Sequence, residues 1–190
     1  MKRRRKMVVG FVVGVVLVAV IILAVTRQKD IVIENVSKLT VTSSAFADGG
    51  MIPEEYSGNG KDISPELQLS RLDKAAVSLA VIMDDIDHPL VGVYNHWLIW
   101  NLPATENIPA EIPDGEQVAQ LNNAVQGIGY GRHRYRGPKP PFGSHRYKYH
   151  VFVLDKKLDL PASAKKKDLL AAMEGHMLQY GYLVGEYAAK

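Results

Sequence analysis

Cysteine is absent from all 190 residues of the sequence. This absence excludes disulfide bonds, thiolate zinc sites and cysteine nucleophiles, and it excludes a bacterial lipoprotein anchor, which needs a cysteine to carry the lipid. Neither the H-E-x-x-H pattern of zinc proteases nor the G-x-S-x-G elbow of serine hydrolases occurs. These absences favour a binding protein over an enzyme, and we expect no catalytic residue, no bound metal and no cofactor.

Basic residues are in the minority outside the first six positions. The formal net charge is +3, with 23 Lys and Arg against 20 Asp and Glu. The run KRRRK at positions 2–6 supplies five of the 23, so the other 18 basic residues face 20 acidic ones, a balance of −2. A mildly acidic domain lacks the charge that attracts a polyanion. We therefore expect no nucleic-acid partner.

One long apolar run lies near the start, where residues 7–25 carry no charge. A run of this length can cross the roughly 30 Å hydrocarbon core of a bilayer as a helix, and the basic residues before it favour a cytoplasmic N-terminus. We expect a cytoplasmic tail at 1–6, an uncleaved signal anchor at 7–25 and a linker at 26–38. The expected location is the cell membrane, single-pass, with the domain extracytoplasmic. A cleavable signal peptide, which would give a secreted protein, is the alternative.

From residue 39 onward the pattern predicts a mainly β, sandwich-like fold with one late helix. The run 75–83 is nearly all apolar, as expected of a strand buried on both faces. In the next strand, strict alternation predicts that His96 shares a face with Leu98 and Trp100. Helical spacing of apolar residues predicts a helix over 165–180, ended by Gly181. Strands are expected at residues 39–46, 75–83, 94–101, 118–125 and 145–155.

The stretch GPKPPFGSHRYKYHVFVLD, residues 137–155, is the most distinctive in the chain. Its first seven residues hold three prolines and two glycines, which make a stiff loop that is neither helix nor central strand. The strand that follows alternates with a period of two, so His145 and Tyr147 share a face and Arg146 lies on the other. An imidazole and a phenol thus stand where a rigid loop enters a sheet, a suitable place for a small binding site.

Five motifs in this order resemble the phosphatidylethanolamine-binding protein family, in particular its bacterial Raf-kinase-inhibitor-like branch. The resemblance covers residues 39–190. It implies a β-sandwich-like Greek-key fold with a small pocket for phosphate-type anions. The motifs are YSGNGKDISPEL (56–67), MDDIDHP (83–89), NHWLIWNLP (95–103), the stretch 137–155 and AAMEGHMLQYGYLVGEY (171–187).

Carried onto this sequence, the family pattern implies a set of ligand-binding residues. The chain departs from the pattern at Ile86, which replaces a proline, at His88, which replaces a small residue, and at Lys139, which adds positive charge to the loop. The implied ligand-binding residues are Asp85, Asp87, His96, Gly137, Pro141, His145 and Tyr147.

A carboxylate-lined pocket repels an anion unless other donors occupy the carboxylates. We therefore expect Asp85 to accept a hydrogen bond from a histidine nitrogen. His96, the Tyr147 hydroxyl and the backbone N–H groups of the loop 137–141 would then donate to phosphate oxygens. The alternative for Asp85 and Asp87 is an Asx-turn without a ligand.

The expected function is that of a membrane-anchored, extracytoplasmic binding protein for a small phosphorylated or anionic ligand, such as a phospholipid headgroup. Inhibition of an exported protease, a protein partner, is the first alternative. The second is a metal-assisted hydrolase. Its metal would lie among five side chains, those of Asp85, Asp87, His88, His96 and His145.

Overall fold

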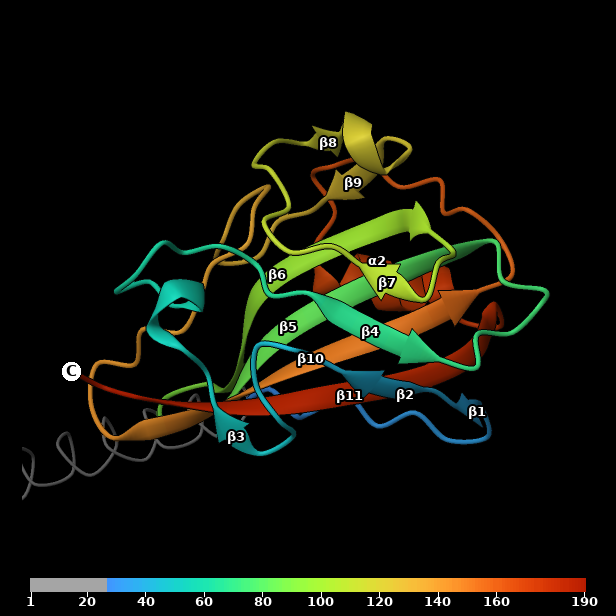
Figure 1. The fold of residues 1–190 in the computed structure, drawn as a ribbon. Coiled ribbons are helices and arrows are strands. Elements are labelled where there is room, and N and C mark those ends of the chain that lie inside the picture. The colour runs from blue at the N-terminus through green and yellow to red at the C-terminus, as the bar shows by residue number, and fades with distance from the viewer. Residues whose placement is uncertain (1–26) are drawn as a thin grey trace, which may run out of the picture.

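The computed structural model describes residues 27–190, which form two β-sheets packed face to face and one helix behind the larger sheet (Figure 1). The mainly β prediction is confirmed. The helix is α2 (Lys166–Met173), and two 3-10 turns are η1 (Glu54–Tyr56) and η2 (Ala119–Leu121). The strands are β1 (Ser37–Lys38), β2 (Thr40–Thr42), β3 (Gly50–Met51), β4 (Leu67–Ser70), β5 (Ser78–His88), β6 (Gly92–Pro103), β7 (Asn107–Ile108), β8 (Gln117–Val118), β9 (Ala124–Gln126), β10 (Ser144–Leu154) and β11 (Met177–Ala188).

The larger sheet places β5 at its centre. Its strand order is β1-β11-β10-β5-β6-β9-β8, with β3 added beside β11, and the smaller sheet has the order β2-β4-β7. The long strands β5, β6, β10 and β11 are antiparallel neighbours. The three strands β10, β5 and β6 therefore form the rigid platform from which the functional side chains project.

Both faces of this platform are buried, which explains the unbroken apolar run in the sequence. On the face toward the smaller sheet, Val81 and Met83 of β5 pack with Val151 and other residues of β10. On the opposite face, Ile82 packs beneath Leu169 of α2. Burying each such side chain contributes about 1.5–3 kcal/mol. The two cores together fix the register of the central strands.

The predicted helix over 165–180 is only half right. α2 ends at Met173, Gly175 follows with a φ of 76°, and from Met177 the chain runs as β11, paired with β10 over its length. Gly181 does not stop a helix but lies within β11, where an added Cβ would collide with the Leu39 carbonyl oxygen. The apolar spacing resembled a helix, and pairing with β10 outweighed it.

The predicted single-pass membrane location is corrected. Within residues 27–190 no helix is long and apolar enough to cross a membrane. The stretch 7–25, on which that prediction rested, lies outside the described residues. The described part of the predicted linker packs against the domain, because the Gln28 N–H donates to the Val91 carbonyl at 2.7 Å and Ile31 joins the core behind the sheet.

Candidate functional site

A cavity of about 250 Å³ lies at one end of the larger sheet, where β5, β6 and β10 meet the loop 137–143. Of the residues expected to bind a ligand, the cavity brings together Asp85, His96, Pro141 and Tyr147. His145 lies behind Asp85, whereas Asp87 and Gly137 are not part of the lining. The lining residues are Asp85, His88, Tyr94, His96, Tyr130, Lys139, Pro140, Pro141 and Tyr147.

The register of the sheet sets three of the lining side chains, Tyr147, Asp85 and Tyr94, next to one another. Tyr147 of β10 is the direct cross-strand partner of Asp85 of β5, and Asp85 is in turn the partner of Tyr94 of β6. Residues directly opposite on neighbouring strands project from the same face with their Cβ atoms about 5 Å apart. The phenol, the carboxylate and the second phenol therefore form one row across three strands.

His96 lies in this row beside a β-bulge, and the prediction that it shares a face with Leu98 and Trp100 was wrong. Met83 pairs with Trp97 and Asp84 pairs with Asn95, so His96 is the extra residue on β6. An extra residue breaks the alternation of a strand and redirects a side chain. His96 keeps the face of Tyr94, two residues before it, and lines the same cavity as Tyr147. Because of the bulge, Leu98, with which His96 was expected to share a face, packs on the opposite side.

Both oxygens of the Asp85 carboxylate are occupied by the protein itself. Its Oδ2 lies 2.7 Å from Nδ1 of His145, and its Oδ1 accepts the Asp87 N–H at 3.0 Å. The Asp85 and His145 side chains are only 4% and 5% exposed. The expected histidine–aspartate hydrogen bond is present, and His145 is the histidine that forms it.

His96 is a neutral imidazole whose orientation the backbone fixes. Its Nδ1 lies 2.8 Å from the Arg136 carbonyl oxygen, and because a carbonyl only accepts, Nδ1 carries the proton. Burial lowers the pKa of His96, although the bond to Arg136 and the charge of Asp85 oppose that effect. At neutral pH the ring therefore leaves an unprotonated Nε2 for the cavity.

The Tyr147 hydroxyl remains a hydrogen-bond donor at any physiological pH. Burial raises its pKa far above the ordinary value, and the nearby Asp85 carboxylate adds to the increase. The backbone N–H of the nearby Lys139 opposes the increase. The Tyr147 ring also packs edge-on against His96, with ring centroids 5.3 Å apart.

Most of the loop amides are not available to a ligand, contrary to expectation. Prolines have no N–H, and the Gly137 N–H donates to Oδ1 of Asp62 at 2.7 Å. An added Cβ at Gly137 would collide with the Tyr56 carbonyl oxygen, so only glycine fits there. Gly137 therefore positions the loop instead of contacting a ligand.

Asp62 holds the loop beside the cavity, a role that the sequence did not reveal. Its Oδ2 accepts hydrogen bonds from Arg136 Nη1 at 2.8 Å and from Arg134 Nη2 at 3.1 Å, while its Oδ1 holds the Gly137 N–H. The peptide group between Arg136 and Gly137 thus donates to Asp62 and accepts from His96. Hydrogen bonds thus connect the Asp62 carboxylate, this peptide group and the His96 imidazole in a series that ends at the cavity. The motif YSGNGKDISPEL was the one available signal.

Asp87 braces the outside of the site. It binds the Arg146 side chain through both carboxylate oxygens, each at 2.7 Å, and Oδ2 also accepts the Arg146 backbone N–H at 2.9 Å. These hydrogen bonds lower the pKa of Asp87. Arg146, which was predicted to lie on the face opposite His145 and Tyr147, is thus the ion-pair partner of Asp87.

The cavity also contains residues that were not predicted as ligand-binding. Tyr94 and Tyr130 form aromatic walls, with ring centroids 5.5 Å apart. The ring of His88, a departure from the family pattern, packs at a tilt against Tyr94 with centroids 5.1 Å apart, and Lys139, another departure, adds a cationic side chain to the lining. Among residues 27–190 no three His, Asp or Glu side chains are placed to hold a metal ion.

The sequence was compared with known families, curated proteins and solved structures. The model of the phosphatidylethanolamine-binding protein family matches residues 42–188. This chain belongs to that family. Among the curated proteins, a UPF0098 protein of Pyrococcus abyssi is 40% identical over 156 residues, covering 80% of this chain and 87% of the relative.

Solved structures of the family agree with the fold. The crystal structure of a phosphatidylethanolamine-binding protein homologue from Chlamydia trachomatis is 34% identical, covers 81% of this chain and 99% of its own, and gives a TM-score of 0.71. YbcL of Escherichia coli also gives 0.71, covering 81% of this chain and 100% of its own at 23% identity. The YbcL likeness concerns the fold alone.

Proposed function

We propose that the chain binds a small phosphate-type anion in the cavity between Asp85, His96 and Tyr147. The observation that supports this most directly is the state of the polar groups. Asp85 is the one carboxylate in the lining, and both of its oxygens are occupied by other donors. Its repulsion of an anion is therefore reduced, while Tyr147 and His96 remain to contact the ligand.

The size of the cavity limits what can enter. Sites for drug-sized molecules measure about 300–1,000 Å³. At about 250 Å³ this cavity fits an oxyanion or a short headgroup but no lipid chain. The family is named for phosphatidylethanolamine, whose headgroup, phosphoethanolamine, is therefore the first ester to test beside inorganic phosphate.

Tyr147 and His96 are the two side chains that we expect to donate hydrogen bonds to the anion. The Tyr147 hydroxyl donates as it stands, and Lys139 contributes positive charge from the loop. Neutral His96 presents a lone pair at Nε2 and must take up a proton before it can donate. A bound anion stabilises that proton, and the resulting charge-assisted hydrogen bond is about twice as strong as a neutral one.

Isothermal titration calorimetry of the full chain with inorganic phosphate and with phosphoethanolamine tests this proposal. Tyr147→Phe removes one hydroxyl and keeps the buried ring, so we expect the affinity to fall about tenfold, the worth of one hydrogen bond to a charged group. Tyr182→Phe, at a half-exposed tyrosine outside the cavity, is the matched control and should bind as the wild type does. Equal affinity of wild type and Tyr147→Phe for both ligands contradicts the proposal.

A further inference from the structure

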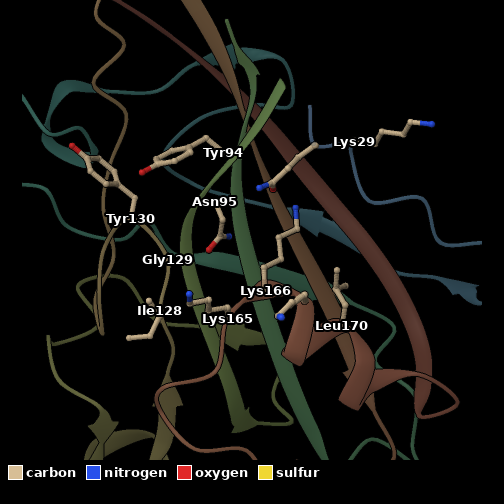
Figure 2. A pocket seen from close by; sticks show the side chains of 11 residues that line it. Lys29, Tyr94, Asn95, Ile128, Gly129, Tyr130, Lys165, Lys166 and Leu170 are labelled. Carbon is tan, nitrogen blue, oxygen red and sulfur yellow. The ribbon is translucent and has the colours of Figure 1, made fainter. Parts of the chain in front are cut away.

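A second and larger cavity, of about 670 Å³, shares a wall with the first (Figure 2). It lies where β6 and the loop 128–130 face the start of α2, and Tyr94 and Tyr130 line both cavities. Its volume is within the range of small-molecule sites. The remaining residues of the lining are Gln28, Lys29, Asn95, Ile128, Gly129, Lys165, Lys166, Lys167 and Leu170.

The charge of this lining is entirely positive. It contains four lysines and no carboxylate. Lys166 reaches across to Asp84 and forms an ion pair, but Lys29, Lys165 and Lys167 form no ion pair with any residue in 27–190. Lys165 and Lys167 also flank the first residue of α2, where the positive end of the helix dipole adds to the field. The cavity therefore favours an anion.

Asn95 provides a second, different polar group, between the lysines and the tyrosine rings in Figure 2. Its Nδ2 donates to the carbonyl oxygens of Met83 (3.1 Å) and Trp97 (3.3 Å) and to Oδ1 of Asp84 (3.0 Å). These three acceptors fix the orientation of the amide. Its Oδ1 is buried and, within the described residues, has no hydrogen-bond donor. Because this oxygen is covered, Asn95 shapes the wall of the cavity, and the lysines are the charged groups that a ligand meets.

We propose that this cavity is a second ligand site that binds a small phosphate ester. The phosphate lies on Lys165 and Lys167, and the carbon skeleton packs against Tyr94. The volume of about 670 Å³ leaves room for that carbon skeleton beside the phosphate. The proposal does not depend on anion binding in the first cavity.

The two sites respond differently to conditions, which allows them to be separated. The first relies on His96, which is neutral above its lowered pKa, whereas the second relies on lysine charges that persist to high pH. Calorimetry with glycerol 3-phosphate at pH 8, in a chain carrying His96→Gln, therefore reports on the second cavity. We expect saturable, one-to-one binding that weakens as salt is added.

The decisive comparison is between two double variants made in that His96→Gln chain. Lys165→Gln with Lys167→Gln should lower the affinity at least tenfold. Lys156→Gln with Lys157→Gln removes the same charge at an exposed loop outside the cavity and should change the affinity less than twofold. No saturable binding in the His96→Gln chain, or an equal loss in both double variants, overturns the site.

Discussion

Sulfate affinity as a function of pH tests the protonation of His96 directly. Sulfate remains fully ionised across the range in which histidine titrates, so any pH dependence comes from the protein. In the free chain, Nδ1–H of His96 is held by the Arg136 carbonyl, and burial keeps the pKa of the ring below its ordinary value of 6.5. At pH 8, therefore, Nε2 carries a lone pair where sulfate needs a donor.

The size of the pH effect on sulfate affinity follows from the uptake of one proton by His96 on binding. Bound sulfate stabilises protonated His96 and so raises its pKa. Affinity is constant below the pKa of the free chain and falls as pH rises from that pKa to the pKa of the complex. Within this window the decrease is about tenfold, or about 1.4 kcal/mol, per pH unit. Between pH 5 and pH 8 we expect the affinity to fall by at least about tenfold.

Calorimetry in two buffers of different ionisation enthalpy measures the proton uptake as well as the affinity. His96→Gln should bind weakly and show no slope, whereas His88→Gln should keep the slope of the wild type, since His88 shares the cavity but is a different imidazole. Wild-type affinity that is equal at pH 5 and pH 8 would refute the reasoning, and so would a slope that disappears in His88→Gln.

Three further measurements probe the structure around the site. Asp62→Asn keeps a hydrogen-bond acceptor for the loop but removes the negative charge, so the peptide group between Arg136 and Gly137 becomes a weaker acceptor for His96. Nitrogen NMR should show the pKa of His96 falling further, and sulfate affinity should fall about threefold or more. Gly181→Ala forces a Cβ against the Leu39 carbonyl, and urea unfolding should show a loss of about 1–3 kcal/mol. Because burial lowers the pKa values of His96 and His150, the unfolded chain binds protons first as pH falls below 6.5, so the urea midpoint should be lower at pH 5.5 than at pH 7.5.

The sequence pattern predicted the central strands because their residue types and two-residue spacing agree with the strands that form. The strand expected at 145–155 is β10, Ser144–Leu154, and the apolar run 75–83 falls largely within β5. Two-residue spacing placed His145 and Tyr147 on one face, and the register with β5 then brought Asp85 to them. A pattern of period two is sufficient wherever a strand stays regular.

The same reasoning failed where tertiary structure changes the period. One extra residue on β6 turns Leu98 and Trp100 away from the face of His96, and nothing in a single sequence marks the position of that bulge. Asp62 was missed for a different reason. It lies in a turn-rich segment with a φ of 60°, and its partners are more than 70 residues away in the chain. Residue type indicates a donor or an acceptor, but only the folded chain determines which partner it meets.

Strand alternation also explains why the two cavities adjoin each other. Asp85 and His96 face the first cavity, so their neighbours on the same strands, Asp84 and Asn95, must face the other side of the sheet. There Asp84 binds Lys166 of α2, and Asn95 lines the second cavity. The bulge at His96 directly follows Asn95, which stays paired with Asp84, so both linings adjoin one irregularity in β6. A substitution that removes the bulge should therefore impair both cavities together, whereas Tyr147→Phe should affect the first alone.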